Sequence, residues 1–302
     1  MSDIIAVLCS DVHLSHLPPL ARSAEPDWYA AMERTLTEIF DITQANACPL
    51  IIAGDIFHKW NSPAELINFA IVQFSKFSAV YAIPGQHDLP GHSYEESFRS
   101  AYKSLIVSSV VIDLLPAAPT FIRGGIIASA FPWGFPVTSI EENPAGKLIQ
   151  LAVVHAYIWD TGFSYPGADE NKFIGKIKKS VAGYHAAVFG DNHKGFQNGN
   201  ILNSGGLFRR NIDEIGYKPS VGLLLKDGSI RRHFLDISKD VFIETDKYLA
   251  IEEGELDFEE YIEELRSMGI STLDFKQELN RKMDASKTCS SVRQIIGSIL
   301  ES

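Results

Sequence analysis

The stretch Val80–Asp88, which reads VYAIPGQHD, sets the pattern by which the rest of the chain is interpreted. Its first part, Val80–Ile83, is a short apolar run of the kind that forms buried strands. A proline and a glycine end the run, and Gln86–Asp88 then places an amide, an imidazole and a carboxylate where the strand stops. Because α/β sheets build their sites at the carboxyl ends of strands, this stretch predicts a strand followed by a functional loop.

The same pattern recurs along the chain. Apolar runs, each followed by a polar or glycine-containing loop, lie at Ile4–Leu8, Leu50–Ala53, Ile126–Ala130, Ile149–Val154 and Ala186–Phe189. Amphipathic helical patterns lie between several of these runs, at Trp28–Ala45, Ala64–Phe77 and Glu95–Ile106. Strands that alternate with helices are typical of a layered α/β fold.

The chain changes in character near residue 236. Before this point, Val221–Lys226 and Ser229–Leu235 predict a β-hairpin that turns at Asp227-Gly228 and closes the second sheet. After it, we expect one strand and three helices, at Val241–Ile251, Asp257–Met268, Thr272–Met283 and Ser290–Leu300. The sequence therefore predicts a main domain over 1–236 and a small, mostly helical region over 237–302.

The composition is that of a globular protein. The chain has 302 residues, of which 45% are hydrophobic, and a mean hydropathy of zero. No run approaches the roughly 18 apolar residues of a membrane span, and the N-terminus lacks the basic start of a signal peptide, so we expect a cytoplasmic location. Three cysteines, Cys9, Cys48 and Cys289, are too scattered for a disulfide framework or a zinc ribbon.

The net charge of −11 is unfavourable for binding nucleic acid, because that binding depends on lysines and arginines that neutralise phosphates. Most of the negative charge lies near the C-terminus, where residues 233–302 contain 16 acidic and 8 basic side chains. Residues 1–232 therefore carry a net charge of only −3.

Aspartates and histidines follow the predicted strands with unusual regularity. Asp11 and His13 come after the first run, and because they are two residues apart they point the same way if the backbone is extended. The later strand ends supply Asp55, His155, Asp191 and His193. Taken alone, each has a structural interpretation, as a loop aspartate, an Asx turn or a surface histidine. Their recurrence at five strand ends favours one shared site.

The order of these groups resembles the motifs of the calcineurin-like metallophosphoesterases, D-x-H, G-D, G-N-H-D/E, H and G-H-x-H, over residues 4 to about 210. The resemblance implies a four-layer α-β-β-α sandwich that holds two divalent metal ions. It assigns seven metal ligands: Asp11, His13 and His193 for the first ion, Gln86, His155 and Asp191 for the second, and Asp55 bridging both. It makes His87 the catalytic histidine and Asp88 the residue that orients it.

Two positions depart from these motifs. Gln86 stands where the family has asparagine, and Asp191 stands where it has the first histidine of the last motif. Both positions belong to the second ion. Each side chain still offers an oxygen, and oxygen ligands suit Mn²⁺ and Mg²⁺, so the departures indicate either a retuned or a lost second site.

The resemblance also implies a reaction. Two ions clamp the phosphoryl oxygens and share a hydroxide that attacks phosphorus in line, so no covalent intermediate is required. His87 then donates a proton to the leaving oxygen or stabilises it. The implied activity is metal-dependent phosphodiester hydrolysis, which chelation of the metal should abolish.

The flanks of the motifs narrow the expected substrate. Gly54–His58 and Asn203–Arg210 resemble the SbcD and meiotic-recombination-eleven branch of nucleases, in which a histidine that matches His58 lies near the scissile phosphate. This resemblance implies a DNA exonuclease or endonuclease of DNA repair, with its catalytic domain over 1–236. It further implies that 237–302 cap the site or bind a partner, an SbcC-like ABC-type ATPase, and that the chain forms a homodimer.

Two alternatives stay open. A phosphodiesterase or phosphatase for small nucleotides or phosphoproteins tolerates the acidic surface better, and a scaffold without catalysis would explain Gln86 and Asp191. Possible DNA contacts are the basic residues Lys172, Lys176, Lys178, Lys179, Lys194, Arg209, Arg210, Arg231 and Arg232 and the aromatic residues Trp133, Phe135, Tyr157, Trp159, Phe163 and Tyr165. The lysines equally suit a solvated helix face, and aromatics in such loops more often pack over the sheet edge.

Overall fold

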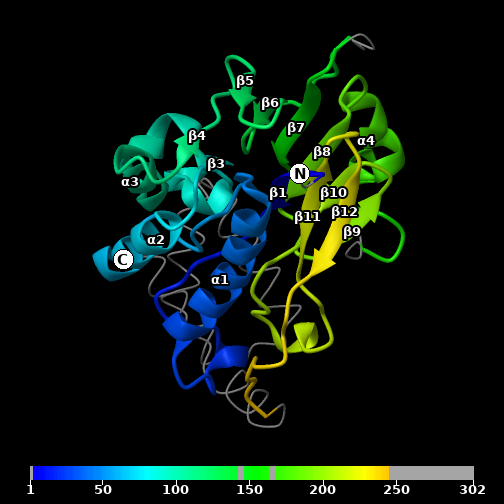
Figure 1. Cartoon of the computed structure of the whole chain (residues 1–302). Coiled ribbons are helices and arrows are strands. Elements are labelled where there is room, and N and C mark those ends of the chain that lie inside the picture. Colours follow the sequence, from blue (N-terminus) through cyan, green and yellow to red (C-terminus); the bar gives the residue numbers. More distant parts are fainter. Residues whose placement is uncertain (1–2, 142–145, 164–167, 245–302) are drawn as a thin grey trace, which may run out of the picture. The chain divides into compact units, whose positions relative to one another are not determined.

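The computed structural model describes residues 3–141, 146–163 and 168–244 (Figure 1). All of them belong to one unit of the chain, Met1–Gly254. The three helices expected after residue 256 and Cys289 lie outside the described residues, as does most of the strand expected over 241–251. Residues 241–244 are described and are not in a strand. The domain division at residue 236 stays a prediction.

The first sheet has six strands in the order β12-β11-β1-β2-β3-β4. Their bounds are β1 Ile4–Cys9, β2 Leu50–Ala53, β3 Val80–Ile83, β4 Ile112–Asp113, β11 Ser220–Leu225 and β12 Ile230–Phe234. Strands β1 to β4 are parallel, and β11 pairs antiparallel with β1. The predicted hairpin is confirmed, but its expected place in the second sheet is wrong. Strand β11 is apolar on both faces, which suits its position inside the first sheet.

The second sheet also has six strands, in the order β5-β6-β7-β8-β10-β9. Their bounds are β5 Thr120–Ile122, β6 Ile126–Phe131, β7 Ile149–His155, β8 Ala186–Gly190, β9 Phe196–Asn198 and β10 Ile201–Asn203. The central strands β6, β7, β8 and β10 are parallel. Its three longest strands, β6, β7 and β8, are the three that the apolar runs predicted.

Four α-helices are described: α1 Trp28–Asn46, α2 Ala64–Phe74, α3 Ala101–Val107 and α4 Ile174–Ser180. The helix expected over 95–106 is divided into a 3-10 helix, Tyr94–Arg99, and α3. The division occurs at Ser100, which has an extended backbone and accepts a hydrogen bond from the amide of Lys103. Other 3-10 helices span Leu20–Arg22, Gln86–Asp88, Pro90–His92, Glu170–Lys172 and Ile212–Glu214. Among the described residues, no helix is long and apolar enough to cross a membrane.

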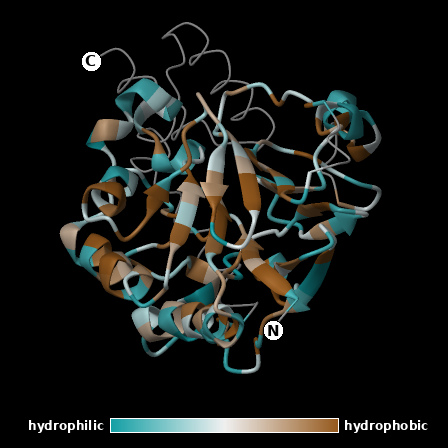
Figure 2. Cartoon of the chain, turned by 45° about the horizontal axis from the view of Figure 1, so that its top comes forward, coloured by the Kyte–Doolittle hydropathy of each residue, from teal (hydrophilic) through white to brown (hydrophobic). Residues whose placement is uncertain are grey.

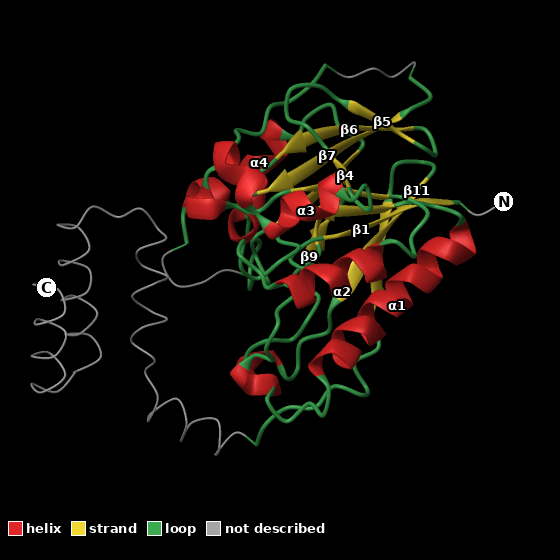
Figure 3. Ribbon diagram, turned by 90° about the vertical axis from the view of Figure 1, so that its left-hand side faces the viewer, coloured by secondary structure: helices red, strands yellow, loops and turns green. Residues whose placement is uncertain are grey.

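The two sheets face each other, and helices cover their outer faces (Figure 3). Leu8, Ile51 and Val153 are among the side chains packed between the sheets. Helices α1 to α3 cover the first sheet, with side chains such as Leu36, and α4 covers the second sheet with Ile174. Figure 2 shows apolar residues in many of the central strands and along parts of the helices. This arrangement is the predicted four-layer α-β-β-α sandwich.

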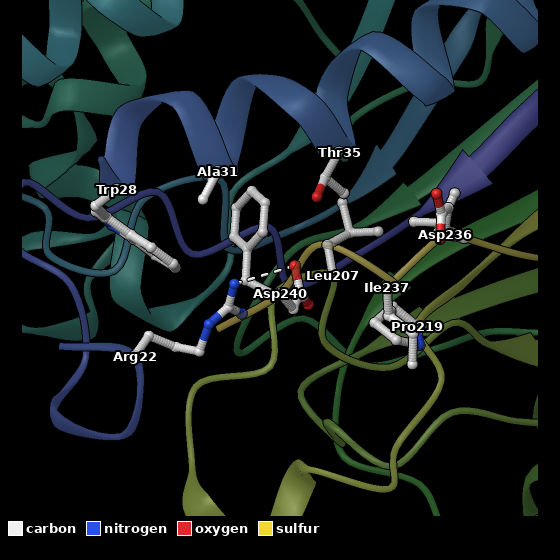
Figure 4. A pocket seen from close by; sticks show the side chains of 11 residues that line it. Arg22, Trp28, Ala31, Thr35, Leu207, Pro219, Asp236, Ile237 and Asp240 are labelled. Atoms are coloured by element: carbon white, nitrogen blue, oxygen red, sulfur yellow. Dashed lines mark ion pairs between the residues drawn. The ribbon is translucent and has the colours of Figure 1, made fainter. Parts of the chain in front are cut away.

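An anchor segment, Ile237–Ile243, is bound to the sandwich by a buried ionic network. Asp240 lies 3.0 Å from Arg22 and 2.9 Å from Arg209, and Figure 4 shows the first of these pairs beside a small pocket. Arg22 also pairs with Glu25 and donates to the carbonyl of Val241. The anchor segment is therefore held against the sandwich up to Ile243.

The Asp240→Asn substitution is expected to destabilise the protein. It leaves two largely buried guanidinium groups without their shared carboxylate, which should lower the free energy of unfolding by about 3 kcal/mol. Urea denaturation checks this. Asp3→Asn, which removes an exposed pair with Lys226, serves as the control and should leave the midpoint unchanged. Equal midpoints for both variants would contradict the expected role of Asp240.

Candidate metal centre

The predicted site residues lie at the carboxyl ends of strands from both sheets. Strands β1, β2 and β3 of the first sheet lead into the loops that carry Asp11, Asp55 and Gln86. Strand β7 ends at His155, and β8 ends immediately before Asp191. Backbone hydrogen bonds join the loops, because the amide of Asp11 donates to the carbonyl of residue 54 and Asp191 donates to the Asp11 carboxylate. The site therefore forms where the edges of the two sheets meet.

Four of the predicted ligands have a left-handed backbone. The φ angles are 50° at Asp11, 47° at His13, 55° at Asp55 and 82° at Asp191. This conformation costs non-glycine residues roughly 1–2 kcal/mol each, and such strain is often found at functional sites. The backbone is therefore not extended at Asp11 and His13, so the condition for their side chains to point the same way is not met. Their side chains still meet, with 3.9 Å between His13 Nε2 and Asp11 Oδ1.

Asp11, His13 and His193 form the first group of candidate ligands. The two imidazole Nε2 atoms lie 3.0 Å apart, and His193 Nε2 lies 4.0 Å from Asp11 Oδ1. Burial, together with the neighbouring cationic groups, lowers the pKa of His13 well below its usual value. His13 is therefore neutral, and a neutral imidazole nitrogen is the form that binds a metal ion.

Asp55, Gln86, His155 and Asp191 form the second group. His155 Nδ1 donates to the carbonyl of Ala53 at 2.7 Å, which turns Nε2 toward Gln86 Oε1 at 2.6 Å and Asp55 Oδ2 at 3.4 Å. Gln86 Nε2 donates to Asp191 Oδ1 at 2.7 Å, which fixes the direction of the amide oxygen. The two positions that depart from the family motifs are thus in direct contact.

The second group requires positive charge at its centre. Asp55 Oδ2 is buried without a hydrogen-bond partner among the described residues, and it lies 3.6 Å from His13 Nε2 in the first group. Burial opposes charge on His155, yet the carboxylates of Asp55, Asp11 and Asp191 raise its pKa to about 10. A cation shared by these atoms would satisfy the same demand. The residues fit a divalent metal centre, with Asp55 placed to reach both groups.

His58 and His87 lie beside the two groups. His87 Nδ1 is 3.0 Å from the carbonyl oxygen of His58, and the two rings are stacked with centroids 5.4 Å apart. The ring of His13 lies 4.9 Å from that of His87. Both predicted catalytic histidines are therefore next to the candidate metal ligands. Their catalytic roles stay predictions.

Asp88 does not orient His87, contrary to the expectation from the sequence. Its buried carboxylate accepts hydrogen bonds from the backbone amides of Ile56, Phe57 and Gly85. Burial and the charge of Asp55 raise the pKa of Asp88 to about 7, against the effect of these hydrogen bonds. Asp88 instead joins the loops after β2 and β3, and the carbonyl of His58 holds the imidazole of His87.

Three glycines leave room for the second group. A side-chain Cβ at Gly54 or Gly190 would overlap the ring of His155, and a Cβ at Gly85 would overlap both Asp55 Oδ1 and His155 Nε2. Gly54 also has a φ of 90°, a conformation that glycine adopts without steric cost, and it turns the backbone before Asp55. Nothing in the sequence distinguished Gly85 from an ordinary turn glycine.

Sequence reasoning missed a serine pair that supports Asp11. Ser10 donates to Asp11 Oδ2 at 2.5 Å and contacts the hydroxyl of Ser204 at 2.8 Å. Both serines are fully buried. The available signal was the position of Ser10 immediately before Asp11, and of Ser204 in a loop already singled out.

The basic residues considered for DNA contact have different environments. The lysines at 172, 176, 178, 179 and 194 are exposed, and so is Arg231. Arg209 is buried against Asp240, and Arg232 donates to the hydroxyl of Ser220. Arg210 donates to the carbonyl of His13. Arg209 is therefore not on an exposed surface, whereas Arg210 contacts the loop of the metal centre that carries His13.

The aromatic residues divide in the same way. Trp133 packs with its ring centroid 6.4 Å from His155, and Trp159 packs against Phe173. Tyr157 lines a cleft of about 460 Å³ beside the metal centre, whereas Tyr165 lies outside the described residues. Other residues that line the cleft are Asp191, Asn192, His193, Lys194, Asn211, Asp213, Glu214 and Tyr217. A ligand at the metal centre could extend into this cleft.

Comparisons with known proteins give one family match and several distant structural matches. A family model described as calcineurin-like phosphoesterase matches residues 6–194. Similar solved structures include TT1561 of Thermus thermophilus, with 11% identity, a TM-score of 0.44 and coverage of 77% of this chain and 99% of that one. The calcineurin-like phosphoesterase YfkN from Bacillus subtilis has 11% identity, a TM-score of 0.42 and coverage of 85% and 98%.

A metallophosphoesterase from Sphaerobacter thermophilus has 13% identity, a TM-score of 0.33 and coverage of 78% of this chain and 90% of that one. No curated protein matches the chain.

Gly85→Ala is expected to weaken metal binding at least tenfold. The new methyl group displaces Asp55 and His155, and a displaced ligand shell loses affinity on this scale. Bound Mn²⁺, measured by calorimetry and by metal analysis after dialysis, checks this. Gly216→Ala is the matched control, because a Cβ there meets no atom within 4 Å. Unchanged Mn²⁺ affinity in a folded Gly85→Ala protein would count against the proposed centre.

Proposed function

Because the chain belongs to the calcineurin-like phosphoesterase family, we propose that this phosphoester hydrolase cleaves phosphodiesters and that its substrate is DNA. The observation that carries the proposal is the position of Asp55 Oδ2, a buried carboxylate oxygen without a hydrogen-bond partner in the described part of the chain. It lies 3.6 Å from His13 Nε2 of the first group and 3.4 Å from His155 Nε2 of the second. A buried carboxylate oxygen of this kind is stabilised by a cation, and members of the family bind divalent metal ions.

The proposed ligands divide into two sets that share Asp55. Asp11, His13 and His193 would hold one ion, and Gln86, His155 and Asp191 would hold the other. Divalent ions at these positions supply Lewis acidity to the phosphoryl oxygens and activate water for attack. Oxygen donors from Asp191 and Gln86 favour Mn²⁺ or Mg²⁺ over softer metals in the second set.

His87 is the proposed proton donor to the leaving oxygen. Its Nδ1 lies 3.0 Å from the carbonyl of His58, and because a carbonyl only accepts, Nδ1 carries a proton. Donation to the leaving oxygen then requires the imidazolium form of His87, in which Nε2 also carries a proton. Burial and the charge of Arg210 lower the pKa of His58 to about 3. His58 is therefore neutral near pH 7 and holds His87 in place through its backbone.

Support for DNA as the substrate comes from two features. The segments Gly54–His58 and Asn203–Arg210 resemble those of SbcD-type nucleases. Helix α4 and the turn before it also carry the lysines at 172, 176, 178 and 179, which can attract a phosphate backbone. The acidic region after residue 232 opposes that attraction, so the lysines are needed for net binding.

A second candidate function is hydrolysis of a small phosphodiester. The cleft beside His193 has a volume of about 460 Å³, which falls in the range of small-molecule sites. Asp213 and Glu214 line it, and these carboxylates would repel a phosphate backbone. This cleft favours a compact substrate with one phosphate at the metal centre and an uncharged group beyond it.

A panel of substrates distinguishes these functions. With Mn²⁺, we expect the protein to cleave linear DNA and bis-p-nitrophenyl phosphate and to leave p-nitrophenyl phosphate largely intact. Cleavage of the small diester without DNA favours the second candidate, and preference for the monoester indicates a phosphatase. No turnover of any of the three would sink the proposal of a hydrolase and favour a scaffold.

His87→Gln should lower kcat on the diester roughly 10²- to 10⁴-fold, because it removes the proton donor while keeping a polar side chain of similar size. Steady-state kinetics measure the change. His233→Gln is the control, since His233 lies on β12 and pairs with Glu38. A kcat close to that of the unaltered protein would assign proton transfer to another group.

Chelation with excess EDTA should abolish cleavage of the diester, and added Mn²⁺ should restore it. The physical reason is that the buried carboxylates and imidazoles of the site have no catalytic cation without the metal. Initial rates before and after dialysis against EDTA provide the test. Full activity in the chelated sample would remove the metal from the mechanism.

A further inference from the structure

Arg210 is fixed beside the candidate metal centre by its neighbours. Its Nη1 donates to the carbonyl of His13 and to the hydroxyl of Ser15, both at 3.1 Å. Its backbone amide donates to Glu214 at 2.6 Å, and Leu207, three residues earlier, donates to the carbonyl of Asp11. The guanidinium group is therefore held against the loop that carries two candidate ligands of the first ion.

The charge of Arg210 is not compensated by an ion pair in the described part of the chain. Within those same residues, its side-chain hydrogen bonds go to neutral oxygens and use Nη1 alone. The adjacent Arg209 differs, because its Nε and Nη2 donate to the carboxylate of Asp240 and its Nη1 donates to the carbonyl of Ile215. Two neighbouring arginines thus have opposite roles, one in the buried network of the anchor segment and one at the site.

The side chain of Arg210 is charged near neutral pH. Burial lowers its pKa to about 10, against the charge of Glu214, which raises it. After burial itself, the charge of Arg210 is the largest cause of the lowered pKa of His58, and it also contributes at His13. A partly buried cation with free donors gains most from an anionic ligand.

The chemistry of a guanidinium group identifies the anion. Its Nε and Nη2 donors lie in one plane and match two oxygens of a phosphate group. A phosphoryl group at the metal centre would lie beside His13, on the loop to which Arg210 is bound. We propose that Arg210 binds a nonbridging oxygen of the substrate phosphate, next to the first metal position. This inference rests on the proposed phosphoesterase function.

The alternative is that Arg210 only supports the loop of His13. Two substitutions in the full-length protein separate these roles. Arg210→Met removes the charge and the guanidinium donors but keeps an unbranched side chain about as long as the aliphatic stem of arginine. Arg210→Lys keeps a charge and one donor for the His13 carbonyl but cannot bind two phosphate oxygens in the plane of a fork. Arg123→Met, at an exposed position between β5 and β6, is the control.

The test measures inorganic phosphate binding to the Mn²⁺-loaded protein by calorimetry, with Mn²⁺ content and KM for bis-p-nitrophenyl phosphate as further readouts. We expect the Kd for phosphate to rise roughly 10- to 100-fold in Arg210→Met and less in Arg210→Lys. KM should rise in parallel while Mn²⁺ content stays constant. Arg123→Met should match the unaltered protein in all three.

Unchanged phosphate affinity in Arg210→Met with normal Mn²⁺ content would overturn the inference, as would an unaltered protein that binds no phosphate. If Arg210→Met also loses Mn²⁺, the Arg210→Lys variant decides the question. A phosphate affinity of Arg210→Lys equal to that of the unaltered protein would then overturn the inference. Phosphate binding that depends on Arg210 in a protein that cleaves no diester would support the inference and reject the proposed function. The two failures are therefore distinguishable.

Discussion

The structure of the site depends on one buried carboxylate, that of Asp55. Its Oδ1 accepts from the amide of His87 at 2.9 Å, and its Oδ2 faces His13 and His155 from opposite groups. Its backbone carbonyl accepts from the amide of His13. One residue thus joins the loops after β1, β2 and β3 to the end of β7. Moving Asp55 would disturb contacts made by three strands of one sheet and one strand of the other.

Strained backbone conformations and a glycine allow this carboxylate to take its position. Asp55 and three other candidate ligands adopt left-handed conformations that are unfavourable for residues with a Cβ. Gly85 leaves the space that Asp55 and His155 fill. These features lower stability locally, and the apolar packing between and outside the two sheets compensates for them. The rigid sandwich therefore allows the strained loops to persist.

Much of the fold and site followed from the sequence, because short apolar runs mark strands and polar residues after them mark the edge of a sheet. The errors concern contacts with the backbone, which residue identities do not reveal. Asp88 was expected to meet the side chain of His87, but it binds three amides, and a carbonyl of His58 takes its place. The hairpin was assigned to the other sheet because local patterns give strand pairing only between neighbours in sequence.

The contribution of ligands by both sheets makes the site a property of the whole sandwich. Asp11 and His193 lie far apart in the sequence, so an unfolded chain has no comparable set of donors. An ion held by these side chains binds the folded state alone and adds to its stability by mass action, by roughly 2.7 kcal/mol at a hundredfold excess over the dissociation constant. The melting temperature of this protein should then rise with the concentration of free metal ion in the solution.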